Sequence, residues 1–68
     1  MPWNAYYAGQ EIASGISLEV VDNLTSLYLR AADQPEPWLD IQGLDTDDNV
    51  AITRVLASRH IPLSFLPS

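Results

Sequence analysis

A proline-containing connector, Gln34-Pro35-Glu36-Pro37, divides this 68-residue chain near its middle. Each proline fixes its own φ and disfavours helical backbone at the residue before it, so no helix can run through the connector. The elements on either side must therefore pack against each other as separate parts of one core. The chain has no cysteine, so that core has to be stabilised by apolar burial rather than by disulfides. We expect one small globular domain over residues 1–68.

Before the connector, the apolar pattern predicts a helix over about residues 17–32, which Ser14 or Ser17 can cap. Its apolar face has helical spacing and consists of Ile16, Val20, Leu24, Leu27, Tyr28 and Ala31. The same residues also alternate between apolar and polar on both sides of Asp22-Asn23, where a turn is possible. A β-hairpin over residues 16–31 is therefore the alternative.

After the connector, the sequence predicts a second helix over about residues 47–59. Asp45 or Thr46 can cap its start, and Asp45 with Asp48 imitates a capping box. Arg59 and His60 fall in the expected last turn, where cations are favoured, and Pro62 would end the helix. A stripe at helical spacing supports this assignment: Ile52, Val55, Leu56 and Arg59.

Three short segments are typical of strands: residues 3–7, 38–42 and 61–66. Alternation within the second segment places Trp38, Asp40 and Gln42 on one face. Residues 38–66 thus read strand, helix, strand, an order that normally makes its two strands parallel. The predicted fold class is α+β, with two helices (about 17–32 and 47–59) packed on a small two- to three-stranded sheet.

The charges are strongly one-sided, with nine acidic residues, three arginines, no lysine and a net charge of −6. No basic residue lies between Arg30 and Arg54, whereas six acidic residues do: Asp33, Glu36, Asp40, Asp45, Asp47 and Asp48. Such a segment repels nucleic acid and anionic membranes, and clustered like charges usually have a reason beyond solubility. The pattern therefore predicts a basic protein partner and no direct contact with nucleic acid or membrane.

Catalytic and cofactor sites are not expected. The chain lacks cysteine and lysine, and its single histidine, His60, falls where a helix would end. The glycines are isolated, so no phosphate-binding loop is indicated. Residues 45–49 resemble the opening of a calcium loop, but Val50 replaces the glycine and Leu56 the glutamate that such a loop requires. We expect neither an enzyme, a cofactor nor a metal site.

In length, absence of cysteine and the acidic stretch from Asp33 to Asp48, the chain resembles small acidic phage-encoded inhibitors such as DNA-mimic anti-CRISPR proteins. The resemblance implies an inhibitor that occupies the basic DNA-binding surface of a target, such as a CRISPR interference complex, by presenting carboxylates in place of phosphates. The partner-binding residues would be the six acidic residues above together with Glu19, Asp22 and Trp38. With no basic leader and no apolar run of transmembrane length, the expected location is the cytoplasm.

The alternative function is an antitoxin, immunity or dimerisation module that binds a protein partner through exposed aromatic side chains. Trp3, Tyr6, Tyr7 and Trp38 are residue types that anchor protein interfaces, although a small core also needs them. Either a monomer or a homodimer is compatible with this composition.

Overall fold

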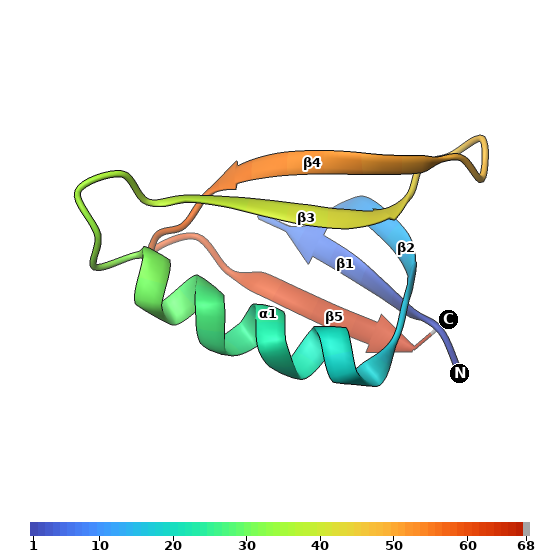
Figure 1. Ribbon diagram of the computed structural model, residues 1–68, viewed down its shortest axis with the longest axis horizontal. Coiled ribbons are helices and arrows are strands. Elements are labelled where there is room, and N and C mark those ends of the chain that lie inside the picture. The colour runs from blue at the N-terminus through green and yellow to red at the C-terminus, as the bar shows by residue number, and fades with distance from the viewer. Residues whose placement is uncertain (68) are drawn as a thin grey trace.

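The computed structural model describes residues 1–67 as one helix and a five-stranded antiparallel sheet (Figure 1). The predicted fold class, two helices on a two- to three-stranded sheet, is therefore wrong. In chain order the elements are β1 (Trp3–Tyr7), β2 (Gln10–Ile16), α1 (Leu18–Ala31), β3 (Trp38–Leu44), β4 (Val50–Leu56) and β5 (Leu63–Pro67). The strands lie side by side in the order β4-β3-β2-β1-β5, so β4 and β5 form the two edges.

The helix predicted over residues 17–32 is present as α1, and the alternative hairpin over 16–31 is wrong. Ser17 is its N-cap and accepts a hydrogen bond from the Val20 amide at 3.4 Å. The buried face differs from the predicted one, because Val21 packs inward with Leu24 and Tyr28 while Val20 is 40% exposed. This spacing of three and four residues still gives α1 one continuous apolar stripe.

The helix predicted over residues 47–59 is wrong, because residues 50–56 form β4. Val50, Ile52, Thr53 and Val55 are β-branched and fit a pleated strand better than a helix. Over its whole length β4 pairs antiparallel with β3, from Leu44 opposite Val50 to Trp38 opposite Leu56. Long-range pairing with β3 thus outweighs the capping residues that favoured a helix.

Those capping residues instead build the hairpin tip, residues 45–49, which joins β3 to β4. One carboxylate oxygen of Asp45 accepts hydrogen bonds from the amides of Asp47 (2.9 Å) and Asn49 (3.0 Å). The same side-chain-to-backbone bonds that start a helix therefore close a turn. Asp48 takes a positive φ of 61°, as is usual for the last residue of a three-residue hairpin loop.

Strand β2 was not predicted, because two irregularities in its pairing with β1 break its alternation. Ala13 and Ile16, three residues apart, both face the core. Between them Gly15 adopts a positive φ of 68°, which suits a bulge. β2 then meets β3 at a single pair, Ser14 opposite Leu44, so the sheet bends sharply there.

The two C-terminal strand predictions are confirmed as β3 and β5, but their expected parallel pairing is wrong. Two strands separate them in the sheet, and β5 pairs antiparallel with β1. The error follows from the missing helix, because a hairpin and not a crossover follows β3. His60 lies in the β4–β5 connection, where its amide donates to Ser58 Oγ, and not at a helix end.

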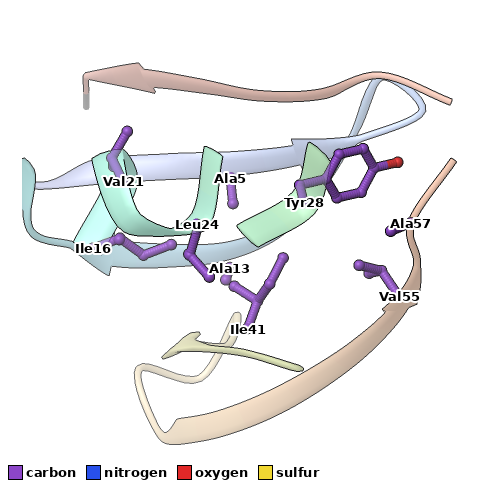
Figure 2. Packing of buried hydrophobic residues seen from close by; sticks show 9 residues of the cluster. All are labelled: Ala5, Ala13, Ile16, Val21, Leu24, Tyr28, Ile41, Val55 and Ala57. Carbon is purple, nitrogen blue, oxygen red and sulfur yellow. The ribbon is translucent and has the colours of Figure 1, made fainter. Parts of the chain in front are cut away.

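The core lies between α1 and the concave side of the bent sheet (Figure 2). Ile41 of β3 is fully buried and points toward α1 and β2. Of the nine buried residues in the described part of the chain, three are alanines, so the core is thin. The full set is Ala5, Ala13, Ile16, Val21, Leu24, Tyr28, Ile41, Val55 and Ala57.

Candidate interaction surface

The side of the β3–β4 hairpin that faces away from Ile41 and Val55 forms one continuous surface, which we call the outer face. It consists of four directly opposed pairs: Trp38 with Leu56, Asp40 with Arg54, Gln42 with Ile52, and Leu44 with Val50. Because alternate residues of a strand point to opposite sides, Trp38, Asp40 and Gln42 share this face as predicted. Five of its eight side chains are apolar.

These apolar side chains are unusually open to solvent. Val50 is 68% exposed, Ile52 67%, Trp38 56% and Leu56 38%. Single exposed apolar residues are ordinary, but neighbouring ones on two paired strands form a patch. Trp38 is also a residue type that anchors protein interfaces when a partner covers it.

An ion pair lies in the middle of the outer face. Arg54 Nε donates to one carboxylate oxygen of Asp40 at 2.8 Å, and Nη2 donates to the other at 3.4 Å. The hydrogen bond from Arg54 holds the pKa of Asp40 below its ordinary value, and raises that of Arg54. Both side chains are at least half exposed, so the pair orders the surface more than it stabilises the fold.

A second ion pair fixes Asp33 just after α1. Arg59, from the β4–β5 connection, donates from Nη2 at 2.7 Å and from Nε at 3.2 Å to the two carboxylate oxygens. These hydrogen bonds lower the pKa of Asp33. Asp33 and Asp40 therefore have arginine partners that are distant in sequence. The lack of any cation between Arg30 and Arg54 in the sequence therefore does not describe the surroundings of these two carboxylates in space.

The other acidic residues proposed for partner binding are dispersed. Asp45, Asp47 and Asp48 lie at the hairpin tip, not in the first turn of a helix, which corrects their predicted placement. Glu36 lies in the connector at the opposite end of the 33 Å long axis (Figure 1). Glu19 and Asp22 are exposed on the N-terminal half of α1. The predicted residues do not form a single row.

Within residues 1–67, several carboxylates gather at the hairpin tip. An open groove of about 420 Å³ beside the tip is lined by Asp45 and Asp48 and also by Glu11 of β2. Sequence reasoning missed Glu11, because β2 itself was missed. The carboxylate of Asp45 is already engaged by two backbone amides, which leaves Glu11, Asp47 and Asp48 more open to a partner.

A second groove, of about 490 Å³, lies between α1 and β3 and adjoins the outer face. Its floor is mostly apolar, and Leu44 and Val50 belong both to the groove and to the outer face. The full lining is Gly15, Ile16, Val20, Leu24, Asp40, Gln42, Gly43, Leu44 and Val50. It extends the apolar surface around the hairpin toward the helix.

Of the four aromatic residues predicted for an interface, Trp38 is the most open, whereas Trp3 and Tyr7 are half-buried and pack against the core. Within residues 1–67, no three carboxylate or imidazole side chains are grouped so that they could hold a metal ion. No helix in that part of the chain is long and apolar enough to span a membrane.

Comparison with known proteins gives no relatives: no family model, curated protein or solved structure matches this chain.

The outer face could have been found from sequence by one signal. Residues 50–56 alternate as Val50, Ile52 and Arg54 against Ala51 and Thr53, and the outer members are the larger side chains.

Proposed function

We propose that this protein is a non-catalytic binding module that engages a protein partner through the outer face of the β3–β4 hairpin. The observation that carries the proposal is the exposure of Val50 and Ile52 on one side of the Asp40–Arg54 pair and of Trp38 on the other, each more than half exposed on the same face. Burying such side chains contributes about 25 cal/mol per Å² of apolar surface, and soluble proteins seldom leave neighbouring ones open without a use.

The Asp40–Arg54 pair gives this surface its specificity. A partner that covers the outer face has to satisfy both charges or leave them solvated at the rim, which favours a partner with a complementary polar pair opposite them. A wholly apolar partner surface would bury the pair in a low-dielectric interface without polar groups to hydrogen-bond to it. The expected partner surface is therefore apolar with a few polar groups, as in ordinary protein interfaces.

The second candidate function is the phosphate-mimic hypothesis, of which an anti-CRISPR-like inhibitor is the example. We propose it for fewer residues than the sequence predicted. The arginine partners of Asp33 and Asp40 reduce their value as phosphate substitutes. The approach of Glu11 to the hairpin tip favours the remaining version, in which Glu11, Asp47 and Asp48 meet a basic groove. Action in the cytoplasm belongs to both proposals, because a chain without cysteine suits a reducing compartment.

The two proposals differ in which side chains they need. We would immobilise the wild type and three variants and quantify the proteins that each captures from cell lysate, at low and at high salt. The outer-face variant carries Val50→Thr and Ile52→Thr, which keep β-branched residues in β4. Asp47→Asn with Asp48→Asn tests the hairpin tip. Leu29→Gln is the matched control, because Leu29 is 56% exposed on α1.

Capture that is lost in the outer-face variant, but kept by the other two and in high salt, is the expected result. If capture is lost in the tip variant and also in high salt, the outer-face proposal is overturned in favour of the phosphate-mimic hypothesis, because exposed charges are screened by salt. Equal capture by all four proteins would exclude both surfaces. Circular dichroism of each variant separates lost binding from lost folding.

A further inference from the structure

The two edges of the sheet differ in their capacity to pair with another strand. The β5 edge is interrupted by proline, since Pro67 lies within the strand and Pro62 just before it, and proline has no amide to donate. The β4 edge has neither proline nor lysine over Val50–Leu56 and is rich in β-branched residues. Natural sheets usually protect such an edge, and this one is not protected.

The alternation of hydrogen bonds shows which backbone groups of β4 are open. In an antiparallel pair, every second residue directs its amide and carbonyl to the neighbouring strand. The bonds that flank the hairpin, from the Asp45 amide to the Asn49 carbonyl and from the Ala57 amide to the Pro37 carbonyl, set the phase. Odd-numbered residues of β4 therefore bond to β3, while Val50, Ile52 and Arg54 direct theirs to the open edge.

The open edge has a defined end. The next residue in this series, Leu56, has its carbonyl occupied by the Tyr7 hydroxyl at 2.8 Å. Figure 1 shows β4 along the upper margin of the molecule, with no other element above it. The free segment thus runs from Val50 to Arg54 and belongs to the same residues that expose Val50 and Ile52 on the outer face.

We propose that two copies of this chain pair antiparallel through their β4 edges, with Ile52 opposite the partner's Ile52. In this register Val50 lies opposite the partner's Arg54. Each open backbone amide and carbonyl of Val50, Ile52 and Arg54 then forms a hydrogen bond with the partner strand. The two-fold arrangement closes on itself and leaves no further β4 edge. The outer faces of the two copies then form one continuous surface, with apolar side chains on both sides of each Asp40–Arg54 pair.

Charge favours the antiparallel orientation of two copies over the parallel one. Antiparallel pairing places the two acidic hairpin tips at opposite ends of the new ladder, whereas parallel pairing would bring them together. It also sets Arg54 opposite the partner's Val50, the strand residue that adjoins the partner's hairpin tip. Arg54, the only cation of β4, therefore lies near the partner's acidic hairpin tip.

The exposed surface agrees with an unsatisfied edge. A monomeric protein of 7.5 kDa is expected to expose about 4250 Å². This chain exposes 4680 Å², and its core is thin. Small domains with thin cores are often completed by association. Pairing uses backbone groups of the edge, whereas the proposed protein partner contacts side chains of the outer face, so the two proposals can hold or fail separately.

The test combines oligomeric state with amide hydrogen exchange. We expect light scattering and sedimentation of the purified protein, from micromolar to millimolar concentration, to show a monomer–dimer equilibrium. In the dimer the amides of Ile52 and Arg54 should be protected at least about tenfold more than in the dilute monomer. The amides of Ala51, Thr53 and Val55 bond to β3 and should be protected in both states.

Two substitutions at one position separate backbone pairing from apolar contact. Ile52→Pro removes an amide that points only to the open edge and should give a monomer at all concentrations. Ile52→Thr keeps that amide and should still dimerise, with the same protected amides. Circular dichroism establishes that each variant is folded.

A wild-type protein that stays monomeric at millimolar concentration would overturn the proposal. So would a dimer in which the Ile52 and Arg54 amides exchange freely, since that dimer would use another surface. Growth into larger or fibrillar assemblies would also contradict a two-fold closure. Protection of the same amides only after a foreign protein is added would assign the edge to that protein and not to a second copy.

Discussion

At the scale of single residues, two positions among the described residues 1–67 hold non-glycine residues at positive φ: Ala8 (54°) and Asp48 (61°). Asp has a short polar side chain that tolerates this conformation, whereas alanine gains nothing there. Ala8 and Gly9 (φ 82°) are the two central residues of the β1–β2 turn, and positive φ at both is typical of a type I′ turn.

Ala8→Asn should therefore stabilise the protein by about 0.5–1 kcal/mol, because Asn-Gly is the preferred pair for this turn. Urea unfolding followed by circular dichroism measures the change as a higher midpoint. The matched control is Ala51→Asn, which places the same residue in β4 and should destabilise, since asparagine is depleted in strands. A lower midpoint for Ala8→Asn would contradict the turn geometry.

The two carboxylate–arginine pairs predict how stability depends on pH. The folded-state pKa values of Asp33 and Asp40 are lowered by hydrogen bonds from Arg59 and Arg54, relative to about 3.9 in the unfolded chain. Their contribution is therefore fully present above pH 4 and is lost as the pH falls through the folded pKa values. Thermal melts between neutral and strongly acidic pH should show this loss.

Removing both carboxylates (Asp33→Asn with Asp40→Asn) should make the melting temperature less dependent on pH in that acidic range. Removing both cations (Arg54→Gln with Arg59→Gln) should have the same effect on the slope. High salt should reduce the difference between these variants and the wild type, because both pairs are exposed. A slope unchanged by either double substitution would show that the pairs do not contribute.

At the scale of elements, the decisive feature is the close contact of β2 with β3. Ser14 and Leu44 form their only paired position, and Gly43 lies beside it. A Cβ atom at Gly43 would lie 2.8 Å from Ala13 Cβ and 2.9 Å from the Ser14 carbonyl oxygen. The bend that joins the β3–β4 hairpin to the rest of the sheet thus depends on a missing side chain.

Gly43→Ala should destabilise the protein by about 1–3 kcal/mol, the usual cost of overpacking, because a backbone oxygen cannot move aside easily. Gln42→Ala, one residue away and exposed, is the control and should change stability by less than about 0.5 kcal/mol. Chemical denaturation of both variants measures the difference. Equal stability would mean that the two strands can separate without cost.

Local signals did not distinguish a helix from a hairpin at residues 45–56. Asp45 offers the same carboxylate-to-amide hydrogen bonds at a helix N-terminus and in a turn. The apolar residues of the segment satisfy a period of 3.6 and a period of 2 almost equally. By contrast, α1 was predictable because Ser17, its amphipathic stripe and the following proline connector all agree.

At the scale of the whole molecule, Tyr28 joins the helix to the connection between β4 and β5. Its ring is buried, and its hydroxyl donates to the Ile61 carbonyl at 2.6 Å and accepts from the Ser58 amide at 3.2 Å. The connection has to cross from one edge of the sheet to the other, so this side chain holds the path of the chain as well as filling the core.

Tyr28→Phe should cost about 1–3 kcal/mol, because it leaves the Ser58 amide and the Ile61 carbonyl without the hydroxyl. Tyr7→Phe also removes one hydroxyl bond, to Leu56, but at an exposed site, and should cost less. Differential scanning calorimetry of the two variants tests the order. If Tyr7→Phe were the more damaging, the tie between β1 and β4 would matter more than the tie to α1.

The acidic surface illustrates how tertiary structure reassigns residues chosen from sequence. Along the chain no cation lies between Arg30 and Arg54, yet Asp33 contacts an arginine 26 positions away and Asp40 one 14 positions away. Trp38, one of the residues predicted for an interface, lies on the outer face beside exposed residues of β4. The outer face itself needed β4 to be recognised as a strand.

By itself the sequence determined the elements whose signals are local: the helix between Ser17 and the connector, and the strands predicted at residues 3–7, 38–42 and 61–66, which the structure places at residues 3–7, 38–44 and 63–67. It also determined the net charge and the absence of disulfides. Only the tertiary structure decided the hairpin, the bulged strand β2, the order of the strands and the partners of the charged residues. These depend on contacts between distant residues, whose energy outweighs local preference where local preference is nearly balanced.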